Sequence, residues 1–364
     1  MKIAIVNNGL ACGGIERAST SLANHWVRKG NEISVIALYQ SIPFFSLEPS
    51  VDFNEPTFPY RGNKHIYTIR MMAWLRLQVK KIEPDAVLAF GESTNPYVLL
   101  ALMRLGVPVF VSDRMHPKAR LPKLTFWLKK RLYPRASAIV VQTQLAKSVI
   151  SSYLLDANIN VIPNPVNVIE PLPLKKLKRI VAIGRLEKVK GHEYLIRAFA
   201  KLESTEWQLS LVGDGSLLNS LKSLAVELGI GGRVIFHRYL KNFRRELSEA
   251  SIFVIPSLKE GFPNALLEAM SVPLPCIVTD FLGSNNEIIN SGVNGLIVPT
   301  KSVDSMAKAI NDLINNPHER ESLAMRAFQV REDYQFDKIA NEWMRLIFSS
   351  TNHKIIHHSC SRKM

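Results

Sequence analysis

The sequence predicts an α/β protein of two doubly wound, Rossmann-like domains that face each other across a cleft. The chain has 364 residues, more than one hydrophobic core usually fills. Short apolar segments alternate with amphipathic ones throughout, as in parallel sheets covered by helices on both faces. Residues 164–176 are rich in proline and then lysine, which is typical of a linker. We therefore expect an N-terminal domain at 1–170 and a C-terminal domain at 175–334.

Apolar periodicity defines the elements of each domain in order. In the N-terminal domain we expect strands at 2–7, 32–38, 85–90, 108–112 and 137–142, and helices at 14–29, 65–82, 95–105, 120–133 and 144–153. In the C-terminal domain we expect strands at 179–184, 207–212, 233–237, 251–255, 275–279 and 295–298. Its helices are expected at 191–202, 216–228, 241–250, 263–271, 302–315, 318–330 and 335–348. Ligands of such folds bind at the carboxyl ends of the strands, where we expect the site.

Composition indicates a globular cytoplasmic protein. Hydrophobic residues make up 47% of the chain, and no apolar run approaches the roughly 20 residues that a membrane span needs. The start of the chain turns polar too soon for a secretory signal. Cys12, Cys276 and Cys360 are scattered, and no cluster of His, Asp or Glu has metal-ligand spacing, so we expect no metal site.

The net charge of +15 is concentrated in one aromatic segment. Residues 114–135 contain no acid and eight basic residues: Arg114, Lys118, Arg120, Lys123, Lys129, Lys130, Arg131 and Arg135. Five bulky apolar residues are interleaved with them: Phe126, Trp127, Leu128, Leu132 and Tyr133. This pattern suggests either contact with an anionic membrane surface or a solvated helix whose aromatic side chains pack inward. No zinc finger, aromatic RNA-binding signature or basic zipper is present, so nucleic acid is not an expected partner.

Two glutamates flank the expected start of the helix at 263–271. Pro263 suits the first helical position, which places Glu260 in the preceding loop and Glu268 on the same face as Asn264. Amides at a helix N-terminus attract anions, and carboxylates bind sugar or ribose hydroxyls. The segment therefore suits a nucleotide-sugar; the alternative is an exposed helix cap with scattered acids.

Two cations follow the first strand of the C-terminal domain. Arg185 and Lys190 flank a loop that opens a helix. Fixed cations there would stabilise the negative charge that a nucleoside diphosphate leaving group gathers as its bond to the sugar breaks. The alternative is an ordinary surface loop, since Lys188 lies nearby.

The N-terminal domain offers weaker signals. Gly13 and Gly14 follow its first strand, as a tight turn or a phosphate-binding loop, but the full G-x-G-x-x-G pattern is absent and no NAD site is expected. His116 lies just past an expected strand, where it either contacts a sugar hydroxyl or is an incidental loop residue.

With these motifs, the chain resembles the family 4 glycosyltransferases, retaining enzymes of the two-domain GT-B fold, over nearly its whole length. The resemblance rests on G-R-x-x-x-x-K-G at 184–191, V-G-D-G at 212–215 and E-G-F-P-N-x-L-x-E-A at 260–269, followed by Gly283, Glu287 and Asn294-Gly295. The segments at 13–17 and 161–165 are similar to the same family. The segment at 112–114 is similar to members that build bacterial surface polysaccharides on lipid carriers.

The resemblance implies roles for the matching residues. Arg185 and Lys190 would hold the diphosphate, and Glu268 the ribose hydroxyls. Glu260, with the amides of Phe262, Asn264 and Ala265, would surround the donor sugar and phosphate. Gly14 would approach the phosphate from the N-terminal domain, and His116 would line the cleft. The helix at 335–350 would pack back on the N-terminal domain.

Arg238 departs from the family pattern, because relatives often carry glycine there, close to the expected base pocket. An arginine at this position would stack on the base or crowd it, which affects the choice of nucleotide.

The resemblance implies transfer of a hexosyl unit, with retention, from a nucleotide-sugar that is expected to be UDP-linked. The acceptor would be a lipid-carried or lipopolysaccharide-type saccharide, and no cofactor or metal would be needed because protein cations replace it. The enzyme would be cytoplasmic and peripheral on the inner face of the cell membrane. A nucleotide-sugar epimerase of the same architecture and a non-catalytic carbohydrate-binding assembly protein are the alternatives.

Overall fold

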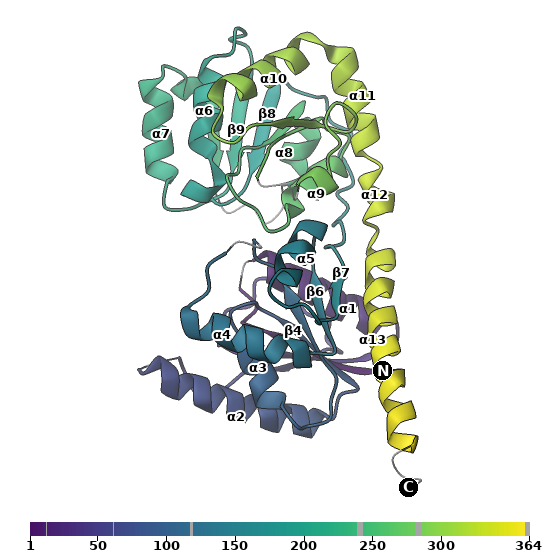
Figure 1. The fold of residues 1–364 in the computed structure, drawn as a ribbon. Coiled ribbons are helices and arrows are strands. Elements are labelled where there is room, and N and C mark those ends of the chain that lie inside the picture. The colour runs from purple at the N-terminus through teal and green to yellow at the C-terminus, as the bar shows by residue number, and fades with distance from the viewer. Residues whose placement is uncertain (12, 61, 117–118, 239–242, 282–284, 361–364) are drawn as a thin grey trace. The chain divides into compact units, whose positions relative to one another are not determined.

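The chain divides into two compact units, Met1–Pro165 with Asp337–Met364, and Val166–Phe336, and each is described by itself (Figure 1). The computed structural model describes residues 1–11, 13–60, 62–116, 119–238, 243–281 and 285–360, the last ten of these by backbone alone. The change from the first unit to the second falls after residue 165, at the start of the expected linker at 164–176.

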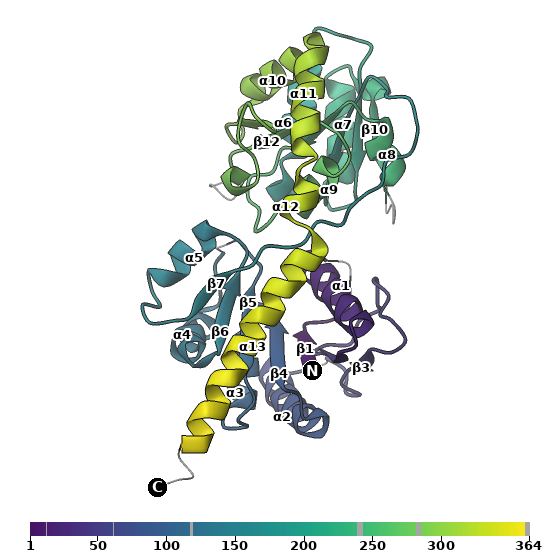
Figure 2. The ribbon, with the colours of Figure 1, turned by 90° about the vertical axis from the view of Figure 1, so that its right-hand side faces the viewer.

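The first unit contains a parallel sheet with the strand order β3-β2-β1-β4-β5-β6-β7. Its strands are β1 (Lys2–Asn7), β2 (Glu32–Ala37), β3 (Asp52–Asn54), β4 (Ala86–Phe90), β5 (Val109–Asp113), β6 (Ala138–Val141) and β7 (Ile159–Val161). Its helices are α1 (Gly14–Arg28), α2 (Lys64–Ile82), α3 (Asn95–Leu102), α4 (Lys123–Leu132), α5 (Gln144–Ser151) and α13 (Phe336–Cys360), with a 3-10 turn at Tyr133–Arg135. Helices α2, α3 and α4 cover one face of the sheet, and α1 and α13 lie on the other (Figures 1 and 2).

The second unit repeats the design with the parallel strand order β10-β9-β8-β11-β12-β13. Its strands are β8 (Arg179–Ile183), β9 (Gln208–Val212), β10 (Val234–His237), β11 (Ile252–Ile255), β12 (Cys276–Thr279) and β13 (Leu296–Val298). Its helices are α6 (His192–Ala200), α7 (Leu218–Glu227), α8 (Arg244–Glu249), α9 (Asn264–Met270), α10 (Val303–Asn315), α11 (Pro317–Ala327) and α12 (Val330–Asp333). Short 3-10 turns occupy Lys188–Lys190, Gly231–Arg233 and Asn285–Glu287.

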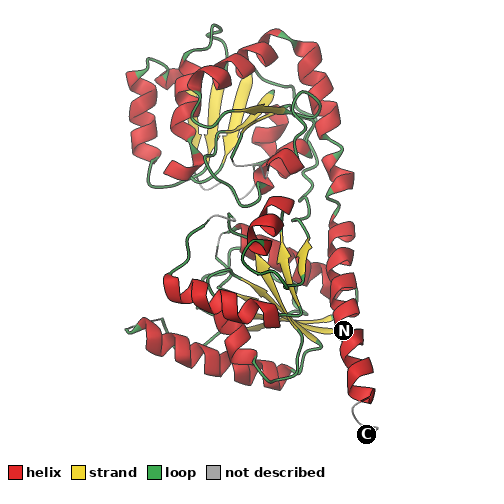
Figure 3. Ribbon diagram, viewed as in Figure 1, coloured by secondary structure: helices red, strands yellow, loops and turns green. Residues whose placement is uncertain are grey.

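The doubly wound α/β architecture predicted for both halves is confirmed, with helices on both faces of each sheet (Figure 3). In each sheet the strand order reverses beside the first strand, between β1 and β4 and between β8 and β11. Such switch points open a crevice at the carboxyl ends of the strands. The loops that leave β8, β9 and β11 therefore define the site of the second unit.

A few elements differ from the sequence prediction. The three-residue strands β3 and β7 were not predicted, because both lie at sheet edges and carry few buried side chains. Helix α4 begins at Lys123 rather than residue 120, after Pro122. Pro263 caps α9 instead of being its first residue. Helix α13 continues to Cys360, past the expected end at 348.

Apolar side chains from both faces form the cores. In the first unit, buried residues of α2, α3 and the strands form one cluster, and Trp343 of α13 packs against Phe90 on the other face. In the second unit, one cluster joins the sheet to α6, α7 and α10, and another joins it to α8 and α9. Parallel strands buried on both faces explain the continuous apolar runs in the sequence.

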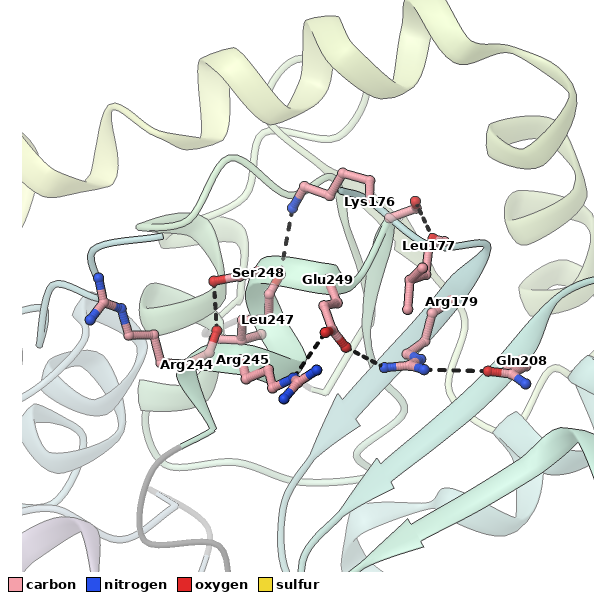
Figure 4. Close-up of polar contacts among 10 residues, drawn as sticks. Lys176, Leu177, Arg179, Gln208, Arg244, Arg245, Leu247, Ser248 and Glu249 are labelled. Carbon is pink, nitrogen blue, oxygen red and sulfur yellow. Dashed lines mark hydrogen bonds and ion pairs between the residues drawn. The ribbon is translucent and has the colours of Figure 1, made fainter. Parts of the chain in front are cut away.

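A charged cluster fastens the amino-terminal edge of the second sheet (Figure 4). Glu249 of α8 accepts hydrogen bonds from Arg179 and Arg245, each at 2.9 Å, and Arg179 also donates to Gln208 at 3.4 Å. The amide of Leu177 donates to the carbonyl of Glu249 at 2.7 Å. Because this cluster lies at the opposite edge from the loops in which we expect the site, we assign it to the fold rather than to the site.

Candidate functional site

Three loops at the carboxyl edge of the second sheet pack backbone against backbone. A side chain on Gly213, after β9, would place its Cβ 2.0 Å from the carbonyl oxygen of Gly184, after β8. Gly191 adopts a left-handed φ of 65°, and a Cβ there would lie 2.1 Å from the carbonyl oxygen of Pro256, after β11. Glycine is needed at both positions because no other residue permits this approach. The G-R-x-x-x-x-K-G and V-G-D-G motifs thus owe part of their glycine content to packing.

Lys190 and Glu260, predicted from separate motifs, form an ion pair. The Nζ atom of Lys190 lies 2.5 Å from Oε1 of Glu260, and the hydroxyl of Ser257 donates to the same oxygen at 2.7 Å. The amide of Leu258 donates to the carbonyl of Val189 at 2.8 Å and fastens the two loops beside this pair. The structure therefore joins the expected phosphate-binding loop to the expected sugar-binding loop.

Arg185 is exposed on the same loop after β8, and its side chain has no hydrogen bond or ion pair to any residue that the structure describes. Glu187, two residues later, accepts hydrogen bonds from the amide and hydroxyl of Ser216 at 2.9 and 2.8 Å. These bonds lower the pKa of Glu187, with a smaller contribution from the charge of Arg185. The loop is thus held by Glu187, while the guanidinium of Arg185 remains available to an anion.

His192, which was not among the predicted site residues, lies beneath this loop. It is the first residue of α6 and is buried. Burial, and then the nearby charge of Lys190, lower its pKa to about 4, so the imidazole is neutral at neutral pH. Its place directly after Gly191 in the lysine-glycine motif was the available signal.

The predicted residues at the start of α9 and within it are buried or half-buried. Phe262 is buried, and its ring lies 6.1 Å from that of Tyr334. The amide of Asn264 donates to the carbonyl of Phe262 at 3.1 Å, so this amide is used within the turn, whereas Ala265 is half-buried. Glu268 is only 2% exposed, and Asn167 donates to its Oε1 at 3.4 Å. The predicted roles of these four residues stay predictions.

Arg238, the departure from the family pattern, pairs with Asp214 of the V-G-D-G motif. Its Nη2 lies 3.0 Å from Oδ2 of Asp214, and its side chain is largely exposed. The guanidinium thus lies beside the loop after β9, where the base pocket was predicted. Gly283 of the resemblance falls outside the described residues.

In the first unit, Gly13 and Gly14 begin α1. Gly13 is extended, with φ of −168°, and a Cβ there would lie 2.1 Å from Oε2 of Glu16, so a flexible side chain rather than backbone geometry restricts it. Gly14 is exposed in the first turn of α1. His116 follows β5 in the loop before α4. The structure leaves the ligand contacts predicted for all three as predictions.

A buried charged network at the carboxyl edge of the first sheet was missed. Lys129 of α4 lies 2.5 Å from Oε1 of Glu92, which follows β4, and 2.6 Å from Oδ2 of Asp113, the last residue of β5. Tyr133 donates to the other oxygen of Asp113 at 2.6 Å. Burial and then Asp113 raise the pKa of Glu92 to about 7, against the opposing effect of Lys129. Acidic residues at or near the carboxyl ends of two neighbouring strands were the signal for this network.

This network corrects the prediction for the basic segment, which was expected either to contact an anionic membrane surface or to be a solvated helix. Lys129 is 1% exposed and saturated by two carboxylates. Arg114 is also buried; it donates to Ser112 at 2.7 Å and to Asn164. Lys118 falls outside the described residues. Of the aromatic side chains, Tyr133 packs inward as the alternative required, whereas Phe126 and Trp127 are exposed together with Lys130 and Arg131.

No group of His, Cys, Asp and Glu suited to a metal ion occurs within the described ranges. Within the same part of the chain, no helix has the length and hydrophobicity to cross a membrane.

Two family models match the chain in consecutive segments that overlap at residues 167–170. Residues 12–170 match the model for "Glycosyltransferase Family 4", and residues 167–330 match that for "Glycosyl transferases group 1". Each match coincides with one of the two domains described above. Together they cover most of the chain.

Similar proteins include enzymes of surface-glycan assembly. A Campylobacter jejuni enzyme that transfers N-acetylgalactosamine in α-1,4 linkage to a diphospho-undecaprenol-linked saccharide is 25% identical over 97% of this chain and 99% of its own length. The lipopolysaccharide 1,6-galactosyltransferase of Salmonella typhimurium is 28% identical over 70% of this chain and 71% of its own length.

Among solved structures, the Anabaena HepE protein in complex with UDP superposes with a TM-score of 0.81. It is 17% identical, and the match covers 96% of this chain and all of HepE. Its similarity supports the GT-B fold. With the family matches in both halves, the chain is a glycosyltransferase of the GT-B fold, similar to enzymes of polysaccharide and lipopolysaccharide biosynthesis.

Proposed function

We propose that this glycosyltransferase moves a hexosyl unit from a UDP-linked sugar to a lipid-carried saccharide in surface polysaccharide or lipopolysaccharide biosynthesis. Transfer retains the anomeric configuration and uses protein cations in place of a metal ion. The observation that carries the proposal is the Lys190–Glu260 pair beside the exposed Arg185, at the carboxyl edge of the second sheet.

The chemistry follows from the charges of this cluster. When the bond between the anomeric carbon and the phosphate oxygen breaks, negative charge builds on the diphosphate. Arg185 offers a planar fork for two phosphate oxygens, and Lys190 offers a point charge. Glu260, which accepts a hydrogen bond from Ser257, holds the ammonium of Lys190 before the donor arrives, so little reorganisation is needed in the transition state. The acceptor hydroxyl then attacks from the same face as the departing diphosphate and loses its proton to it.

The neutral His192 fits this arrangement. A protonated imidazole beneath the loop would repel Lys190, and its low pKa avoids that repulsion at neutral pH. We propose that His192 supports the loop without exchanging a proton during transfer.

Donor and acceptor classes are supported by what similar proteins bind. HepE binds UDP, and the Campylobacter enzyme acts on a saccharide carried by diphospho-undecaprenol. Because such acceptors lie at a membrane, we further propose a cytoplasmic enzyme held peripherally at the inner face of the cell membrane. The exposed Phe126, Trp127, Lys130 and Arg131 of α4 support this location.

A donor screen tests the proposed reaction. Release of nucleotide is measured with a panel of nucleotide-hexoses and extracted carrier-linked oligosaccharides, and NMR reads the anomeric configuration of the product. Lys190→Met should lower kcat by about 10²- to 10³-fold, the usual effect of removing one charge-stabilising donor from an active site. Lys188→Met, an exposed lysine of the same 3-10 turn, is the matched control and should change kcat less than about threefold.

Equal turnover in the two variants would contradict the role of Lys190. An epimerised nucleotide-sugar formed without acceptor would identify an epimerase instead, and inversion at the anomeric carbon would exclude the retaining reaction.

A further inference from the structure

We infer that helix α2 (Lys64–Ile82) is a second membrane-docking element, whose outer apolar stripe enters an anionic bilayer surface. This inference deepens the proposed function, since an acceptor carried on a lipid would be met at a membrane. It concerns a helix that neither the basic segment nor the donor site includes.

Helix α2 is apolar on two opposite faces. Its inner face packs into the core of the first unit through side chains spaced four residues apart: Tyr67, Met71, Leu75 and Val79. Its outermost line has spacings of three, four and four residues, and consists of Ile66, Ile69, Ala73 and Leu77. With 3.6 residues per turn, these four side chains form one stripe directly opposite the buried face.

The apolar side chains of this stripe are largely exposed to solvent. Ile66, Ile69 and Leu77 are exposed by 59%, 64% and 64%, and together they make a continuous line rather than scattered single residues. An aligned stripe of this kind marks an interaction surface. Core packing does not explain it, because the opposite face of the same helix already supplies the core contacts.

The charges beside the stripe indicate what kind of partner it binds. Helix α2 contains no acidic residue and five lysines and arginines. Arg70, Lys80 and Lys81 are exposed near the stripe, while Arg76 is turned to the end of α3 and donates to the carbonyls of Ala101 and Met103 at 2.7 and 2.9 Å. An apolar line bordered by cations matches the acyl boundary and the anionic headgroups of a bilayer. The same cations would repel one another across an interface between two copies of α2.

The neighbouring helices continue this surface. Helix α3 contacts both α2 and α4, so all three belong to one layer on the same face of the first sheet (Figure 1). Helix α4 exposes Leu124, Phe126 and Trp127 together with Lys130. Two helices of one layer thus carry exposed apolar and basic side chains, and we assign both to the membrane side of the first unit.

Vesicle binding of the full chain tests the inference without donor or acceptor. Co-sedimentation is measured with vesicles of 30% phosphatidylglycerol in phosphatidylcholine and with phosphatidylcholine alone. Ile69→Gln with Leu77→Gln should weaken binding to the anionic vesicles by at least about tenfold, because two large aliphatic side chains no longer leave water. Arg70→Gln with Lys81→Gln should also weaken it, with a smaller residual dependence on salt.

The matched control is Val226→Gln with Met325→Gln, two exposed apolar residues of α7 and α11 in the second unit, which should bind as the wild type does. Unchanged binding of the Ile69/Leu77 variant overturns the inference, as does a wild type that ignores anionic vesicles. A wild-type dimer that this variant converts to monomers, without vesicle binding, assigns the stripe to a second copy and also overturns it. Transfer to a detergent-dispersed acceptor is assayed in parallel, so failure of docking and failure of the proposed reaction give different results.

Discussion

Lys129→Met tests whether the buried network of the first unit is built around one ammonium. The substitution keeps an unbranched side chain in α4 but leaves Glu92 and Asp113, both nearly inaccessible, without their shared cation. Removing one partner of a buried ion pair costs about 3–5 kcal/mol, because the remaining charge stays desolvated. Two carboxylates share this lysine, so we expect a value at the upper end of that range.

Tryptophan fluorescence during urea unfolding reports mainly on the affected unit. Four of the five tryptophans belong to the first unit: Trp26, Trp74, Trp127 and Trp343. Trp207 belongs to the second. The matched control is Lys130→Met, the exposed neighbour on the same helix, which should change the free energy of unfolding by less than about 0.5 kcal/mol.

The deficit of Lys129→Met should grow with pH. The folded-state pKa of Glu92 is about 7, above the ordinary 4.5, because the effects of burial and Asp113 outweigh that of Lys129. Tyr133 and Tyr153 are further titratable groups near this carboxyl. A carboxyl with a raised folded-state pKa binds its proton more tightly when folded, so its contribution is present below pH 4.5 and is lost as pH rises through 7. Over that window the loss is about 3 kcal/mol in the wild type. Without the ammonium the pKa rises further, so the variant should lose more at pH 8 than at pH 5.

A combined substitution separates the charge effect from simple loss of packing. Glu92→Gln with Asp113→Asn and Lys129→Met removes all three charges, and it should recover most of the stability that Lys129→Met alone loses. The reasoning is refuted if Lys129→Met matches Lys130→Met, or if its deficit is the same at pH 5 and pH 8.

Two further predictions concern the second unit. Gly191→Ala should destabilise the protein by at least about 2 kcal/mol and reduce transfer, because its Cβ would lie 2.1 Å from the carbonyl oxygen of Pro256. The control is Gly229→Ala, which has a similar φ of 71° but no neighbour within 4 Å of the added Cβ. In a thermal unfolding assay this control measures the cost of the left-handed backbone alone. His192→Gln should remove part of the acid sensitivity of unfolding. The folded-state pKa of His192 is about 4, below the ordinary 6.5. Its contribution to the free energy of unfolding is therefore complete above pH 6.5 and is lost as pH falls through 4, by up to about 3 kcal/mol. Urea unfolding across this pH range, followed by Trp207 after the other tryptophans are replaced, measures the effect, and an equally steep pH dependence in the variant would argue against it.

Sequence alone was sufficient for the architecture of each unit and for locating the loops that the proposed donor site uses. Strand and helix periods are local properties, and buried parallel strands such as Ala86–Phe90 are apolar along their whole length. The edge strands at Asp52–Asn54 and Ile159–Val161 lack that signal because only one side of each is paired. The glycines and cations at 184–191 identify this loop in the sequence, because a turn of this kind accepts only certain residues at each position.

Only the tertiary structure decided which charges are buried and which apolar faces are exposed. Lys129 and Lys130 are neighbours with the same side chain, yet one meets carboxylates that lie 37 and 16 positions earlier in the chain and the other meets solvent. Likewise, the sequence of α2 contains two apolar faces, and only the packing of the sheet decides which of them is buried. Burial depends on contacts between segments far apart in the chain, whereas periodicity depends only on neighbours, and this difference separates what sequence determined from what the fold decided.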